Sequence, residues 1–122
     1  MKWLSRFGIE HLASQMRYTL SGGEAQRASL ARAFALEPEI LMMDEPFSSV
    51  DNISRQGLIK TFKEVQSASK TTTLLVTHDF REVQALADRV FVISNRKPEA
   101  QGTPEEIARH PVWKALATAD SY

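Results

Sequence analysis

Three short stretches of the sequence carry side chains that could act on a phosphate group. The first is the acidic pair Asp44 and Glu45, which follows the apolar run Ile40–Met43. One carboxylate at the end of a buried strand can hold Mg²⁺ through a bound water, and its neighbour can orient an attacking water for phosphoryl transfer. An isolated acidic pair more often caps a helix or lies in a solvated loop, and that alternative stays open.

The second stretch is the start of an alanine-rich segment, at Ser21, Gly22, Gly23 and Glu24. Two glycines allow a close approach of the backbone, and the free amides at a helix start attract an anion such as a terminal phosphate. Ser21 adds a hydroxyl donor. Serine followed three residues later by glutamate is also the spacing of a capping box, so an ordinary capped helix is the alternative.

The third stretch is Thr77–Asp79, with His78 at its centre, directly after a second apolar run. An imidazole can donate a hydrogen bond to a phosphate oxygen that is developing charge. A lone histidine is more often a structural hydrogen-bonding residue. Together the three stretches favour a phosphate site more strongly than each does alone, because all would lie along one edge of a sheet, or on a loop that can meet it.

Alternating strands and helices are predicted to position these residues. Apolar runs without alternation favour strands covered on both faces, and the intervening helix has the length that a parallel crossover needs. The order βαβαβ predicts an α/β fold with a parallel sheet and right-handed crossovers. From the N-terminus we expect two short helices over 1–20, a helix over 22–36 ending before Pro38, a strand at 40–43, a helix at 52–69, a strand at 73–77, a helix at 80–87 capped by Asp79, a strand at 89–94, a polar turn at 96–102 and a helix at 104–118 interrupted at Pro111.

The composition limits the class of protein. The chain has 122 residues, of which 43% are apolar, and this is enough for one domain. Fifteen basic and fifteen acidic residues balance, so a nucleic acid is not the expected partner. The chain has no cysteine, no apolar run long enough to cross a bilayer and no secretory leader, so we expect a cytoplasmic location.

Together these motifs resemble those of the ATP-binding cassette (ABC) ATPases, from Leu20 to the end of the third strand and more loosely to Ile107. The resemblance implies a truncated P-loop NTPase core over 37–122 with a C-terminal helix, and a helical-subdomain remnant over 1–36 that includes the signature helix. Leu20–Glu24 with Gln26 and Arg27 is similar to the signature motif, Ile40–Pro46 to the Walker B strand, Ser48–Asp51 to the D-loop, and His78 to the switch histidine.

The resemblance also implies a role for each matched residue. Asp44 would help to place Mg²⁺ through water, Glu45 would polarise the attacking water, and His78 would contact the γ-phosphate of ATP. Ser21, Gly22, Gly23 and Glu24 form the loop that would contact ATP held by the opposite subunit of a head-to-tail dimer. Asp51 would couple the two sites.

One departure from the family pattern is important. The chain contains no Gly-x-x-x-x-Gly-Lys-Ser/Thr segment, so the cradle for the β- and γ-phosphates is missing. We therefore expect the chain alone not to bind ATP tightly, and to be either a fragment of a longer cassette or a natural half. Uncovered sheet and helix faces predict self-association. Trp3 and Tyr18, the aromatics nearest the missing half, are assigned to packing.

The function implied by the resemblance is that of an ATP-hydrolysing subunit of an ABC transporter. Gly102–Ile107 is similar to a segment of importer cassettes, and an anion such as molybdate or tungstate is the cargo we expect, although other polypeptides decide that choice. The implied partners are a second ABC ATPase subunit in a homodimer and transmembrane permease subunits, which would hold the protein on the inner face of the cell membrane. Two alternatives remain: an ABC ATPase acting on DNA or ribosomes, and a catalytically silent half that supplies a signature loop to a partner.

Overall fold

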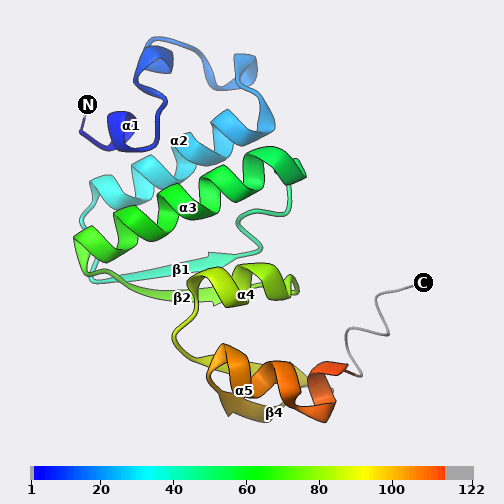
Figure 1. The fold of residues 1–122 in the computed structure, drawn as a ribbon. Helices are drawn as coiled ribbons and strands as arrows, with labels where there is room; N and C mark the ends of the chain where they lie inside the picture. The colour runs from blue at the N-terminus through cyan, green and yellow to red at the C-terminus, as the bar shows by residue number, and fades with distance from the viewer. Residues whose placement is uncertain (1, 115–122) are drawn as a thin grey trace. The chain divides into compact units, whose positions relative to one another are not determined.

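The computed structural model describes residues 2–114, which form two compact units that divide between His78 and Asp79 (Figure 1). The predicted helix at 104–118 therefore lies partly outside the described residues. The first unit contains α1 (Lys2–Arg6), two 3₁₀ turns (Glu10–Leu12 and Arg17–Thr19), α2 (Gly22–Ala35), β1 (Ile40–Asp44), α3 (Asn52–Ser69) and β2 (Thr72–Val76). The second contains α4 (Phe80–Leu86), β3 (Val90–Ser94), β4 (Lys97–Gly102) and α5 (Pro104–Arg109).

Helix α2 begins at the predicted capping box. The Ser21 hydroxyl accepts a hydrogen bond from the Glu24 amide at 3.3 Å, and the Glu24 carboxylate accepts one from the Ser21 amide at 2.8 Å. Trp3 packs as expected, with its ring stacked on that of Phe34 at 5.7 Å. The assignment of Tyr18 to packing is wrong, because this residue is 84% exposed in a 3₁₀ turn that buries none of its residues.

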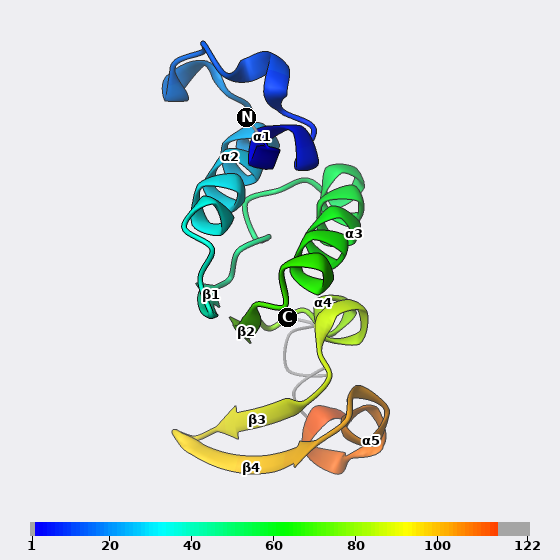
Figure 2. The same cartoon turned by 90° about the vertical axis from the view of Figure 1, so that its left-hand side faces the viewer.

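Strands β1 and β2 form the parallel pair that the sequence predicts, with Ile40 opposite Thr72 and Asp44 opposite Val76. The 18-residue helix α3 makes the crossover between them, and it lies beside α2 over one face of the sheet (Figures 1 and 2). A core of large apolar side chains fills this layer: Phe7, Leu30, Phe34, Met43, Phe47, Leu58, Phe62 and Val65.

The expectation that β1 is covered on both faces is wrong in this structure. Its burial alternates along the strand, and only Met43 is buried. On the opposite face Ile40 is 65% exposed and Met42 72%, and the β2 residues Leu74 and Val76 are also more than half exposed. An apolar run without alternation can therefore sit in a sheet that has one bare apolar face, which we call the open face of the β1–β2 sheet.

The third predicted strand does not join the parallel sheet among the described residues. Instead β3 pairs with β4 in an antiparallel hairpin, with Ser94 opposite Lys97. Asn95 and Arg96 both have positive φ, at 49° and 63°, which is the backbone of a tight two-residue hairpin turn. The predicted polar turn at 96–102 is thus largely strand, and its polar composition reflects exposure of most of β4.

The second unit is stabilised by contacts of its helices. Asp79 caps α4 as predicted, since its side chain accepts a hydrogen bond from the Arg81 amide. The rings of Phe80 and Trp113 lie 4.4 Å apart. Helix α5 begins at a capping box at Thr103 and ends at Arg109, and the interruption predicted near Pro111 is confirmed. Among residues 2–114 no helix combines the length and hydropathy needed to cross a bilayer.

Candidate functional site

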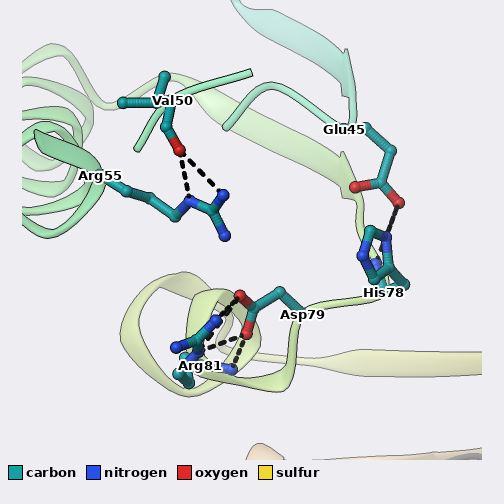
Figure 3. Close-up of polar contacts among 6 residues, drawn as sticks. All are labelled: Glu45, Val50, Arg55, His78, Asp79 and Arg81. Carbon is teal, nitrogen blue, oxygen red and sulfur yellow. Dashed lines mark hydrogen bonds and ion pairs between the residues drawn. The ribbon is translucent and has the colours of Figure 1, made fainter. Parts of the chain in front are cut away.

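Glu45 and His78, two of the predicted site residues, lie in direct contact (Figure 3). One carboxylate oxygen of Glu45, Oε1, is 2.7 Å from Nδ1 of the His78 ring and also accepts a hydrogen bond from the His78 amide at 3.1 Å. The other oxygen, Oε2, accepts no hydrogen bond from the part of the chain that the structure describes. The His78 side chain is 72% exposed, so the pair lies open to a ligand.

The parallel register explains why these two residues meet. Asp44 is opposite Val76, so the chain leaves both strands at the same edge of the sheet, with Glu45 and His78 just beyond. The Glu45 amide donates to the Val76 carbonyl at 2.8 Å. Glu45 has a left-handed backbone with φ of 46°, a conformation that non-glycine residues rarely take and that is common at functional sites.

Asp44 is exposed at the carboxyl end of β1, and strand alternation places it on the open face with Ile40 and Met42. Among the described residues no group of three or more acidic or histidine side chains could form a complete metal cage. A single exposed carboxylate suits Mg²⁺, which keeps several waters and is bound by one or two carboxylates together with substrate phosphates. The donor set therefore fits a magnesium ion that arrives with a nucleotide.

The residues Ser21, Gly22, Gly23 and Glu24 form the first turn of α2. Ser21 and Glu24 are engaged in the capping box, so the alternative of an ordinary capped helix is realised for their side chains. The capping interaction holds the pKa of the Glu24 carboxyl below its usual value, chiefly through the hydrogen bond from the Ser21 backbone. The amides of Gly22 and Gly23 donate to no acceptor among residues 2–114, and two such amides at a helix start can bind an anion.

Asp51 is the N-cap of α3, a structural duty that the sequence interpretation did not include. Its carboxylate accepts hydrogen bonds from the amides of Ile53 and Ser54 at 3.1 and 3.0 Å. These bonds, with that from Ser54 the largest, lower the pKa of the Asp51 carboxyl. The preceding segment lies against α2, because a Cβ atom at Gly22 would be 3.1 Å from the Ser49 carbonyl oxygen.

The structure thus groups the predicted residues in two places. Glu45 contacts His78, and the start of α2 contacts the segment that ends at Asp51. One contributing residue was missed: Arg55, whose guanidinium binds the Val50 carbonyl (Figure 3). Its signal in the sequence was a basic side chain near the start of a helix, where the helix dipole disfavours positive charge.

Comparison with known proteins shows which protein family this chain resembles. The profile of the family described as ABC transporter matches residues 1–48. A sulfate/thiosulfate import ATP-binding protein, CysA of Yersinia pestis, is 45% identical over 106 residues, which are 87% of this chain and 29% of that protein. An Fe(3+) ions import ATP-binding protein, FbpC 2 of Rhizobium meliloti, is 48% identical over 117 residues, which are 96% of this chain and 29% of that protein.

A solved structure agrees with the sequence relatives. The cbiO1 protein of Clostridium perfringens, described as part of the ABC transporter complex cbiONQ, superposes with a TM-score of 0.80 at 31% identity, covering 96% of this chain and 47% of that one. The chain belongs to the ABC transporter ATPase family. Against these ABC proteins it spans between about a third and a half of their length. The named cargoes of the two sequence relatives differ, and neither is molybdate or tungstate, so that expectation stays untested.

Proposed function

We propose that this chain is the catalytic portion of an ATP-hydrolysing subunit that energises an ABC importer. The observation that carries the proposal is the Glu45–His78 contact at the carboxyl end of the β1–β2 pair, with the Asp44 carboxylate next to it. Two sequence relatives named as import ATP-binding proteins support the importer branch. Another polypeptide segment must supply the phosphate cradle, because the chain has no Gly-x-x-x-x-Gly-Lys-Ser/Thr.

Each residue of the pair has a distinct task in this proposal. Oε2 of Glu45 accepts an attacking water and orients it toward the γ-phosphate, while Oε1 remains bound to His78. Mg²⁺ bound near Asp44 through water would neutralise charge on the phosphate oxygens. The Gly22 and Gly23 amides serve the ATP of a second ABC subunit, because they lie at the start of α2 against Ser49 and Val50 and not at the carboxyl end of the β1–β2 pair.

The hydrogen bond to Glu45 constrains how His78 acts. A carboxylate only accepts, so Nδ1 of the ring must carry the proton of this bond. In a neutral imidazole the other nitrogen, Nε2, is then an acceptor and would face a phosphate oxygen without a proton. Contact of His78 with the γ-phosphate therefore uses the doubly protonated ring, which donates from both nitrogens and stabilises the negative charge of the transition state.

The partners and location follow from the importer assignment. A second ABC ATPase subunit would complete each site, and permease subunits in the cell membrane would bind the pair on the cytoplasmic side. An ABC ATPase acting on DNA or ribosomes is less consistent with the balanced charge of the chain. A catalytically silent half that supplies a signature loop to a partner is the second candidate, and the Glu45 substitution described next tests it.

The test is Glu45→Gln in the complete cassette that contains this chain. Glutamine keeps an acceptor for His78 but loses the basic oxygen, so turnover of ATP should fall by about 100-fold or more while ATP binding persists. Glu39→Gln is the matched control, because this exposed acid lies at the other end of β1. Steady-state hydrolysis that is equal in the two variants would remove Glu45 from the catalytic role and favour the silent half.

A further inference from the structure

Arg55, on the first turns of α3, makes a contact to which neither the motifs nor the comparisons assign a role. Its guanidinium donates two hydrogen bonds to one acceptor, the Val50 carbonyl oxygen, from Nη2 at 2.9 Å and from Nε at 3.3 Å (Figure 3). Val50 itself is 3% exposed. A buried carbonyl without a partner is costly, so this two-point contact determines where the Val50 peptide lies.

The residues that Arg55 holds, Ser48–Asp51, are packed against the start of α2. A Cβ atom at Gly22 would lie 3.1 Å from the Ser49 carbonyl oxygen, and one at Gly23 would lie 3.8 Å from the Val50 side chain. The absence of a side chain at Gly22 allows the segment to approach the helix this closely, whereas a Cβ atom at Gly23 would make an ordinary van der Waals contact. A displacement of Ser48–Asp51 would therefore change the surroundings of both glycines.

The same segment is connected to Glu45. The Glu45 carbonyl accepts a hydrogen bond from the Ser48 hydroxyl at 2.9 Å and one from the Ser48 amide at 3.3 Å. The Val50 amide donates to the Phe47 carbonyl at 3.2 Å. A continuous set of backbone contacts thus runs from the Arg55 guanidinium to the strained residue whose side chain binds His78.

We propose that Arg55 is a positioning residue that holds Ser48–Asp51 in a single geometry against both the start of α2 and the Glu45 turn. This inference rests on the proposed function in one respect: the segment and the Gly22–Gly23 amides then face the nucleotide of a second subunit as one rigid unit. Arg55 touches no reacting atom in this scheme. It acts on hydrolysis through the placement of Asp51 and of the Glu45 backbone.

The first experiment measures position without any nucleotide, by amide hydrogen exchange of the chain. Arg55→Met keeps an unbranched side chain and removes both donors, so exchange of amides in the 48–55 region should become at least about 10-fold faster than in the unsubstituted chain. Gln66→Met is the matched control, since the side-chain amide of Gln66 donates to the Thr71 carbonyl at the other end of α3. Exchange over 48–55 that is equal in the two variants would overturn the proposal.

The second experiment measures ATP hydrolysis by the complete cassette. With Arg55→Met, kcat should fall about 10- to 100-fold while KM for ATP stays within about two-fold, because a small misplacement impairs the reaction geometry and spares the binding cradle. Arg55→Lys retains one donor and should recover part of kcat. A kcat for Arg55→Met equal to that of Gln66→Met would refute the role in hydrolysis.

The two experiments separate the two proposals. If the unsubstituted complete cassette hydrolyses no ATP, the proposed function fails, and the exchange measurement still decides whether Arg55 fixes Ser48–Asp51. If the cassette is active and Arg55→Met changes neither exchange nor kcat, the proposed function stands and Arg55 is a surface contact of no consequence for the site.

Discussion

The left-handed backbone at Glu45 predicts an unusual order of stability for substitutions at this position. At most sites alanine is more stable than glycine, because glycine has greater conformational freedom in the unfolded chain. At Glu45 the φ of 46° reverses the preference, since a Cβ atom in this conformation costs about 1–2 kcal/mol and glycine avoids that cost. Glu45→Ala and Glu45→Gly both remove the hydrogen bonds to His78, so those losses cancel in the comparison.

The expected difference is the strain relieved less the entropy of glycine. Relief of about 1–2 kcal/mol against a conformational cost of about 0.5–1 kcal/mol leaves Glu45→Gly more stable than Glu45→Ala by about 0.7 kcal/mol at the midpoints of these ranges. Gly57 in α3 is the control, because an added Cβ there would meet Arg27 at an ordinary 3.6 Å. Gly57→Ala should therefore stabilise the chain by about 0.5–1 kcal/mol, in the conventional direction.

Urea denaturation at several protein concentrations measures both comparisons, since a shift in midpoint without a change in slope reports stability alone. Opposite signs at positions 45 and 57 support the strained turn. If Glu45→Ala were as stable as Glu45→Gly, or more so, the backbone at this position would not be left-handed and the positioning of the side chain toward His78 would need another cause.

Three further predictions concern other parts of the first unit. Gly23→Cys with Ser54→Cys should form a disulfide in a chain that has no other cysteine, because the two Cβ atoms would lie 3.8 Å apart, and thiol titration should then find no free thiol. Closure of a loop of about 30 residues should stabilise the chain by about 3.6 kcal/mol. Because the pKa of Asp51 is lowered on folding, its contribution to stability is fully present above the unfolded pKa of about 4 and is lost as the pH falls through the lowered value. The stability difference between the unsubstituted chain and Asp51→Asn should therefore be largest at neutral pH and shrink as the pH falls below about 4 in denaturation curves. The open face should cause self-association, and Met42→Lys with Leu74→Lys should reduce it in sedimentation, whereas a monomeric unsubstituted chain at micromolar concentration would contradict this origin.

Local signals predicted the helices of the first unit well. The Ser21–Glu24 capping box starts α2, Pro38 follows its end, and α3 has the predicted bounds of 52–69. The Glu45–His78 contact was also predictable, because two parallel strands of similar length bring their carboxyl ends together. These features depend on residues close in the sequence or on a topology that strand order already restricts.

Features that depend on distant partners could not be predicted. β4 contains Pro98 and mostly polar residues, so its strand character comes only from pairing with β3 across the Asn95–Arg96 turn. The left-handed backbone of Glu45 occurs where the chain leaves β1, a strand whose bounds depend on its pairing with β2. The side chain of Arg55 gives no indication of which carbonyl it will bind. In each case the conformation depends on a contact with a residue that the neighbouring sequence does not identify.

The two acids of the Asp44–Glu45 pair are separated by this long-range geometry. Asp44 remains in the strand and lies on the open face with Ile40 and Met42, whereas Glu45 leaves the strand at the left-handed turn and reaches His78. A cation at Asp44 would therefore sit at the border of the apolar surface that is bare in this structure. Because burial of apolar side chains and exclusion of water both strengthen electrostatic contacts nearby, whatever segment covers Met42 would also strengthen binding at Asp44.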